Sequence, residues 1–149
     1  MNYAIVDLGS NTVRLSVYHI LPRGDYELLF SKKEMAGLVN YISDGVLSQA
    51  GIRKACEVLW NFWGLLRHFG IENMHVFATA SLRNIHNSDE AVAAIREETG
   101  IDVDVISGCT TTGPCVAVAA ETYADRYFQL TPSASSTDVT AGHDNVFQM

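Results

Sequence analysis

Residues 7–15 read Asp-Leu-Gly-Ser-Asn-Thr-Val-Arg-Leu and connect two apolar segments. Residues 3–6, which precede them, are short and apolar, as expected of a buried strand. Residues 15–20, which follow, alternate in part between apolar and polar side chains, which is typical of a second strand. We therefore predict a tight strand–turn–strand corner between Asp7 and Arg14.

The residues of this corner suit a phosphate site. Gly9 can adopt backbone angles that other residues avoid, and successive N–H groups in such a turn can form a concave nest for an anion. Arg14 could add a planar, permanently charged fork, whereas Asp7 would repel a phosphate unless a metal ion or water lies between them. The alternative is an ordinary hairpin turn, for which Gly, Ser, Asn and Asp are equally typical.

Length, composition and charge narrow the classes of protein. The chain has 149 residues, of which 48% are hydrophobic, and this fits a globular domain with its own core. The net charge of −7 is unfavourable for non-specific nucleic-acid binding. The sequence has neither an apolar run of membrane-spanning length nor a signal-peptide pattern, so we expect a cytoplasmic protein without membrane or nucleic-acid partners. Cys56, Cys109 and Cys115 are irregularly spaced and are expected to be free thiols.

Further elements are predicted along the chain. We expect strands at 26–31, 73–78 and 103–106, a long helix at 48–69 and a shorter one at 89–99. Ser48 is the expected N-cap of the long helix and Gly70 its stop. The core-facing stripe of that helix is predicted to comprise Leu47, Ile52, Ala55, Cys56, Leu59, Trp60, Trp63 and Leu66. The strands at 73–78 and 103–106 follow helical crossovers and should run parallel to the first strand.

A second polar motif lies at residues 78–87, which read Ala-Thr-Ala-Ser-Leu-Arg-Asn-Ile-His-Asn. Thr79, Arg83 and Asn87 recur every four residues, so they would share one face if the segment were helical. That face would carry hydrogen-bond donors for phosphate oxygens. The alternative is a capped surface helix with a solvated arginine.

The string Asp-x-Gly-Ser-Asn-Thr-x-Arg resembles the first phosphate loop of the exopolyphosphatase/guanosine pentaphosphate phosphohydrolase (Ppx/GppA) family. Residues 78–87 resemble the Ala-Thr-x-Ala/Ser-x-Arg-x-Ala-x-Asn motif of the same family. The resemblance implies an α/β fold: a ribonuclease-H-like, actin-like domain over residues 1–108, with a mixed β-β-β-α-β-α-β sheet flanked by helices. It also implies that Asp7 faces Mg²⁺, directly or through water. The phosphate ligands it implies are Gly9, Ser10, Asn11, Thr12, Arg14, Thr79, Arg83 and Asn87.

The resemblance is interrupted after Gly108. The family has a run of acidic residues there, including a glutamate that acts on the attacking water, whereas residues 109–115 read Cys-Thr-Thr-Thr-Gly-Pro-Cys and offer no general base. It resumes at 136–140 and 144–149, which are similar to the second phosphate loop and implicate Ser136 and Thr137 in phosphate binding. Residues 131–135 lack the acid and glycines of that loop. Residues 109–149 are therefore expected to be a divergent tail or the product of a reading-frame slip.

These features predict a fragment of a phosphohydrolase that releases terminal phosphate from polyphosphate or guanosine pentaphosphate and is inactive as written. The missing acid supports the prediction of inactivity. The prediction of a fragment is supported because the second domain of the family would begin near the end of this sequence. A non-catalytic phosphate- or nucleotide-binding or interaction module is the main alternative. Half of a sugar kinase or another ATPase fits the Ser-Asn-Thr-x-Arg string less well. The sequence does not choose between the two substrates, and it is compatible with a homodimer.

Overall fold

The computed structural model describes residues 1–105, 129–131 and 146–148. The chain divides into two compact units, Met1–Ile106 and Ser107–Met149. In the second unit, β8 (Gln129–Thr131) pairs in parallel with β9 (Val146–Gln148). Ser136 and Thr137, and with them the predicted remnant of the second phosphate loop, lie outside the described residues.

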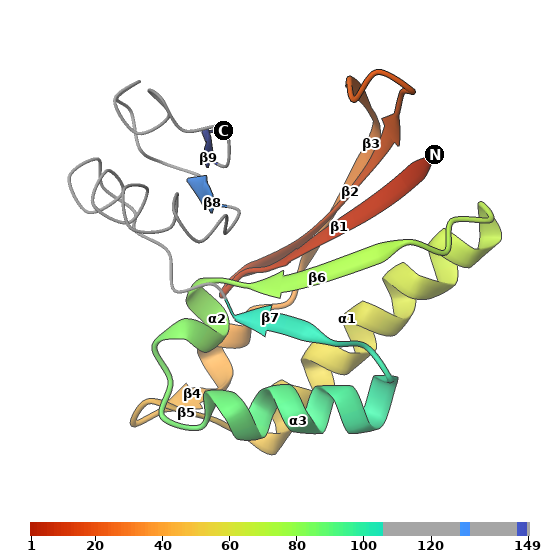
Figure 1. Ribbon diagram of the computed structural model, residues 1–149. Helices are drawn as coiled ribbons and strands as arrows, with labels where there is room; N and C mark the ends of the chain where they lie inside the picture. Colours follow the sequence, from red (N-terminus) through yellow and green to blue (C-terminus); the bar gives the residue numbers. More distant parts are fainter. Residues whose placement is uncertain (106–128, 132–145, 149) are drawn as a thin grey trace. The chain divides into compact units, whose positions relative to one another are not determined.

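The first unit is built on a five-stranded mixed sheet (Figure 1). Its strands are β1 (Asn2–Leu8), β2 (Thr12–Ile20), β3 (Tyr26–Met35), β6 (Met74–Ala78) and β7 (Val103–Val105), in the order β3-β2-β1-β6-β7. The first three strands form an antiparallel meander, and β6 and β7 run parallel to β1. The predicted ribonuclease-H-like topology is confirmed.

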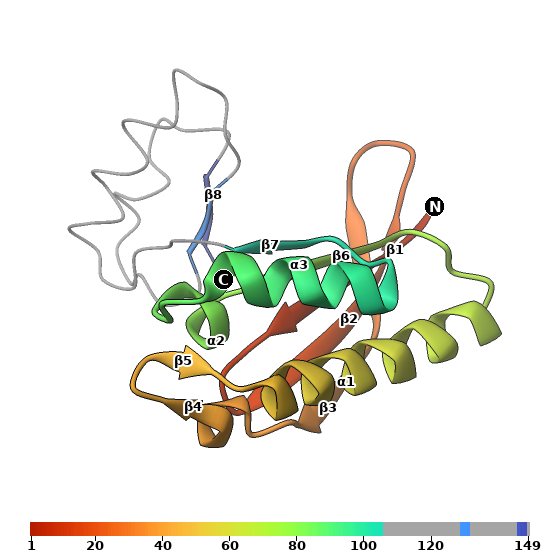
Figure 2. The ribbon, with the colours of Figure 1, turned by 90° about the horizontal axis from the view of Figure 1, so that it is seen from below.

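Two helices cover one face of this sheet, as Figures 1 and 2 show: α1 (Gln49–His68) and α3 (Ser88–Thr99). The predicted start of α1 is confirmed, because the Ser48 hydroxyl accepts a hydrogen bond from the Gly51 N–H at 3.3 Å. Both helices end before a glycine with positive φ, Gly70 at 67° and Gly100 at 72°. Within the described residues, no helix combines the length and apolar character that a membrane span requires.

The core lies between the sheet and the two helices. Alternate residues of β1 and β2 are buried against the helices, which is the expected pattern for a sheet covered on one face. The predicted stripe of α1 is wrong at Trp60, which is 48% exposed, whereas Phe62 is fully buried. Cys56 is a free, buried thiol as predicted. Burial, together with the Glu98 carboxylate, raises the pKa of this thiol to about 11.

The connection between β3 and α1 contains regular structure. β3 continues past residue 31 to Met35 because it stays paired with β2 as far as Thr12. A short 3₁₀ helix, η1 (Leu38–Tyr41), then leads into a hairpin of β4 (Ile42–Ser43) and β5 (Val46–Leu47). The two turn residues of this β4–β5 hairpin have positive φ, which is the geometry that two-residue hairpins favour.

Candidate phosphate-binding corner

The predicted corner forms at the end of β1, but its turn is narrower than expected. β1 continues to Leu8 and β2 begins at Thr12, so only residues 9–11 lie between the strands. Asp7 and Arg14 are directly opposite each other in the antiparallel ladder. Both side chains point to the face of the sheet opposite the helices, because their neighbours Leu8 and Val13 are buried against the helices.

Gly9 is required for space at this corner. A Cβ atom at this position would lie 2.5 Å from the Thr12 carbonyl oxygen, which is closer than real side chains come. The unusual backbone angles expected of this glycine do not explain it, because Gly9 is not among the glycines with positive φ. The close approach of two backbone segments explains this glycine.

Hydrogen bonds from η1 and from its N-cap residue, Gly37, hold the turn. The Ser10 carbonyl accepts from the Val39 N–H, and the Asn11 carbonyl accepts from the Gly37 N–H, each at 2.9 Å. In a trans peptide the C=O and N–H point to opposite sides. The N–H groups of Asn11 and Thr12 therefore point away from Gly37 and Val39. The nest of Gly9 and Ser10 N–H groups stays a prediction.

The second motif meets the corner through Thr79. Its hydroxyl donates a hydrogen bond to the Asp7 carboxylate at 3.3 Å, across 72 positions of the chain. Burial raises the pKa of the Asp7 carboxyl, while the Thr79 hydrogen bond and the Arg14 charge oppose that shift. Three segments of the chain thus supply a cation, a carboxylate and a hydroxyl to one place.

A residue that sequence reasoning missed, Ser81, fixes the second motif to the corner. This side chain is fully buried in α2 (Ala80–Arg83), and its hydroxyl donates a hydrogen bond to the Leu8 carbonyl. It therefore ties α2 to the last residue of β1. The sequence signal was weak, because a serine shows its need for a hydrogen-bond partner only once its burial is known.

The prediction that Thr79, Arg83 and Asn87 share one helical face is wrong. α2 is a single turn that ends at Arg83, and Asn87 lies at the N-cap position of α3, where its side chain makes no capping hydrogen bond. The Asn87 amide is bound to the main chain of Leu47, accepting from its N–H at 2.9 Å and donating to its carbonyl at 3.0 Å. Asn87 therefore has a structural role, and phosphate binding by Asn87 stays a prediction. Arg83 is half-buried, and its backbone N–H donates to the Thr79 carbonyl at 2.9 Å.

Thr12 also has a partner within the protein, because its hydroxyl donates a hydrogen bond to the Met35 sulfur at 3.3 Å. This contact joins β2 to β3 beside the turn. Phosphate binding by Gly9, Ser10, Asn11, Thr12 and Arg83 stays a prediction.

The corner offers one carboxylate for a metal ion. Among the described residues no three acidic, histidine or cysteine side chains gather into a metal cluster. Mg²⁺ keeps several waters and commonly binds through one or two carboxylates together with substrate phosphates. Asp7 alone therefore fits the predicted role only when phosphate oxygens complete the coordination.

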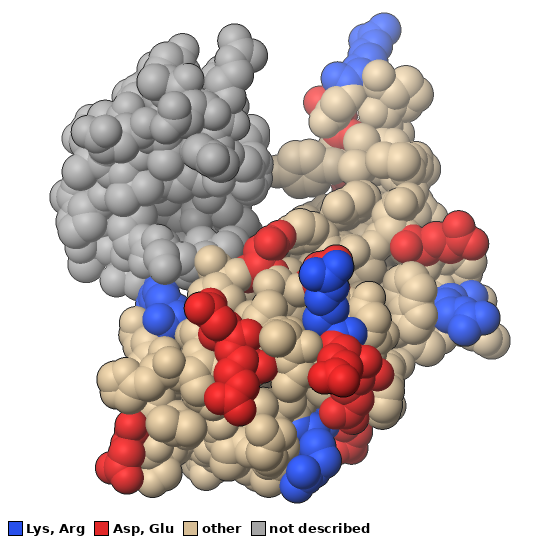
Figure 3. Space-filling model, turned by 60° about the horizontal axis from the view of Figure 1, so that its bottom comes forward, with Lys and Arg blue, Asp and Glu red and all other residues tan. Residues whose placement is uncertain are grey.

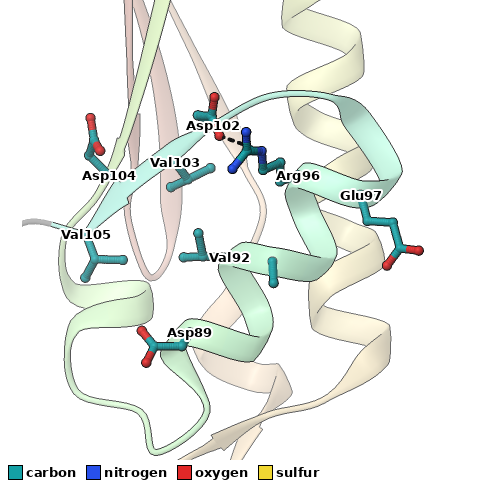
Figure 4. Close-up of a pocket in the computed structure, with 9 residues that line it drawn as sticks. Asp89, Val92, Arg96, Glu97, Asp102, Val103, Asp104 and Val105 are labelled. Atoms are coloured by element: carbon teal, nitrogen blue, oxygen red, sulfur yellow. Dashed lines mark ion pairs between the residues drawn. The ribbon is translucent and has the colours of Figure 1, made fainter.

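A hollow of about 670 Å³ lies elsewhere, between α3 and β7 (Figure 4). Figure 4 shows Val92, Val103 and Val105 facing the space between helix and strand, and an ion pair joins Arg96 Nε to Asp102 Oδ1 at 3.0 Å. The other charged residues of its lining are acidic: Asp89, Glu97 and Asp104. This excess of carboxylates is unfavourable for a phosphate chain. On the face seen in Figure 3, acidic and basic side chains are interspersed.

Comparison with known proteins decides the family. The family model for the Ppx/GppA phosphatase family matches residues 17–130, which is most of the chain. The chain belongs to the Ppx/GppA phosphatase family. The matched range continues past Gly108, after which the acidic run of the family is missing from this sequence.

Curated relatives and solved structures agree with this assignment. Exopolyphosphatase 1 of Mycobacterium leprae is 28% identical over 109 residues, which are 72% of this chain and 32% of that protein. The guanosine-5'-triphosphate,3'-diphosphate pyrophosphatase of Pseudoalteromonas translucida is 30% identical over 71% of this chain and 21% of its own length. The crystal structure of the Aquifex aeolicus Ppx/GppA phosphatase, type II variant, has a TM-score of 0.64 at 25% identity, covering 87% of this chain and 43% of that one.

The chain therefore has the actin-like fold of its Ppx/GppA relatives, as predicted. It spans about a third of the length of the mycobacterial exopolyphosphatase that it matches.

Proposed function

We propose that the corner of Asp7, Arg14 and Thr79 holds the terminal phosphates of polyphosphate or guanosine pentaphosphate in a Ppx/GppA-type phosphohydrolase. The observation that carries this proposal is the convergence of the three side chains from β1, β2 and the end of β6. Ligands of open α/β sheets commonly bind beyond the carboxyl ends of the strands, where this corner lies. The names of the relatives, an exopolyphosphatase and a guanosine pyrophosphatase, support the substrate class.

Each side chain has a distinct task in this proposal. Arg14 binds phosphate oxygens with two parallel N–H groups and offsets the charge that develops during transfer. Thr79 orients the Asp7 carboxylate, and Asp7 would hold Mg²⁺ together with water and phosphate oxygens. The ion would neutralise phosphate charge. Because phosphoryl transfer depends mainly on positioning and electrostatics, a rigid corner is well suited to it.

A second candidate function is a non-catalytic phosphate-binding module. The observation in its favour is that residues 109–115 hold no carboxylate that could act on the attacking water. Both functions need the same corner, and they differ in whether phosphate is released.

Calorimetric titration tests the shared part of the two proposals. The purified chain is titrated with tripolyphosphate, guanosine pentaphosphate and ATP, each with and without Mg²⁺. We expect Arg14→Gln to weaken binding of the first two by about tenfold or more, because a charge-assisted hydrogen bond is lost. The matched control is Arg53→Gln, which removes an exposed arginine of α1. Equal affinities of the two variants would contradict the proposed site.

A further inference from the structure

A row of side chains crosses the face of the sheet that points away from α1 and α3. The strand registers place Lys33, Arg14, Asp7, Phe77 and Asp104 side by side, one from each strand in the order of the sheet. Arg14 and Lys33 are both exposed. The row therefore brings a second cation next to the proposed phosphate corner.

Arg14 and Lys33 are directly opposite each other on neighbouring strands, and like charges in that position destabilise a sheet. The pair is nevertheless held in register. On one side, Thr12 donates to the Met35 sulfur at 3.3 Å; on the other, the hydroxyl of Ser16 donates to that of Ser31 at 3.5 Å. The two cations are thus kept together by contacts on both sides.

Lys33 differs from the other lysines in its surroundings. It has no ion pair or hydrogen bond within the part of the chain that the structure describes. Lys54 binds the Glu57 carboxylate at 3.2 Å. Lys32 is adjacent to Lys33 on β3, yet its side chain lies on the opposite face, with its ammonium 5.8 Å from the centre of the Phe62 ring.

We propose that Lys33 contacts the phosphate next to the one that Arg14 holds, so that the corner binds a chain of phosphates better than a single phosphate. An anion between the two cations removes their repulsion, and neighbouring strands are only about 4.8 Å apart. Two long side chains at that spacing can reach successive phosphate groups. This inference rests on the proposed function of the Asp7–Arg14 corner.

The test compares tripolyphosphate with orthophosphate in calorimetric titrations of the whole chain. Lys33→Gln should weaken tripolyphosphate binding about fivefold, as expected for one exposed ionic contact, and leave orthophosphate binding unchanged. Lys32→Gln removes the same charge one residue away on the other face and should change neither affinity. Lys33→Arg should retain tripolyphosphate binding. Lys33→Gln should also keep or raise the melting temperature without ligand, because the repulsion with Arg14 is relieved.

Two outcomes would overturn the inference, and they are distinguishable. If Arg14→Gln weakens tripolyphosphate binding while Lys33→Gln matches the parent chain or Lys32→Gln, the role of Lys33 is refuted and the corner stands. If the parent chain binds neither anion, the proposed function fails and the inference fails with it.

Discussion

The Asn87 side chain is paired with the main chain of Leu47, although 40 residues separate them. Its amide both accepts from the Leu47 N–H and donates to the Leu47 carbonyl, as a neighbouring strand would. The adjacent His86 N–H donates to the Gly45 carbonyl at 2.6 Å. The loop between α2 and α3 is thereby joined to the β4–β5 hairpin, which leads into α1.

Replacement of Asn87 by alanine should therefore destabilise the fold. Both hydrogen bonds are partly buried, and we expect a loss of about 1–3 kcal/mol in the free energy of unfolding. Urea denaturation followed by circular dichroism measures this. Asn84→Ala, at an exposed position in the same loop, is the matched control and should change stability by less than about 0.5 kcal/mol. Similar losses in the two variants would show that the Leu47 pairing contributes little.

Alanine at Gly9 and at Gly64 should have opposite effects. At Gly9 the added methyl group meets the Thr12 carbonyl, so the backbone must move, and we expect destabilisation of about 1–3 kcal/mol with weaker tripolyphosphate binding. At Gly64, in the interior of α1, nothing lies within 4 Å of the added carbon. Gly64→Ala should stabilise the chain by about 0.5–1 kcal/mol through higher helix propensity. A neutral Gly9→Ala would show that the turn can widen freely.

The pH dependence of stability should report on Asp7. Burial raises the pKa of its carboxyl above the ordinary 3.8, so the folded state holds the proton more tightly than the unfolded state. The contribution of this group to stability is therefore fully present below 3.8 and is lost as the pH rises through the folded-state pKa. Asp7→Asn removes the titration and should raise the melting temperature at pH 7, with an advantage that shrinks as the pH falls toward 3.8.

Melting curves of the parent chain and Asp7→Asn between pH 3 and 8 test this. Asp25→Asn, in the exposed turn before β3, removes a carboxylate outside the corner and serves as the control. An Asp7→Asn variant that melts below the parent chain at pH 7 would mean that the Arg14 charge outweighs the cost of burying the carboxylate.

The chain as written should release no phosphate from polyphosphate or guanosine pentaphosphate above background. Residues 109–115 contain no carboxylate, and the loss of a positioned general base typically costs about 10²–10⁴-fold in rate. Residues 131–135 also lack the glycines that would let backbone N–H groups approach a phosphate. A colorimetric phosphate assay, with heat-denatured chain as the blank, measures the rate. Mg²⁺-dependent release that Asp7→Ala abolishes would refute this prediction and require another base.

The order and direction of the strands could be predicted because local signals fix them. Short apolar runs mark the strands, and helical crossovers force β6 and β7 to run parallel to β1. The residues at the ends of α1 were equally predictable, since Ser48 and Gly70 act within one turn of the helix. The site motif was found through its resemblance to a family, and the structure places Arg14 and Thr79 beside Asp7.

The features that could not be predicted depend on contacts with distant parts of the chain. α1 has apolar residues around much of its circumference, so its own periodicity does not decide between Trp60 and Phe62. Contact with the sheet decides it, and Lys32 of β3 covers the Phe62 ring. The pairing of Asn87 with Leu47 could not be predicted, because 40 residues separate the two in sequence.

The Thr79–Asp7 hydrogen bond also sets an order of events during protein synthesis. The residues of the β1–β2 corner are translated before Thr79, and Asp7 cannot meet its hydroxyl partner until 72 further residues have been added. At typical elongation rates this takes roughly 4–14 seconds. During that interval a nascent chain can form the antiparallel meander, with Asp7 and Arg14 in place before the segment that carries Thr79 has been made.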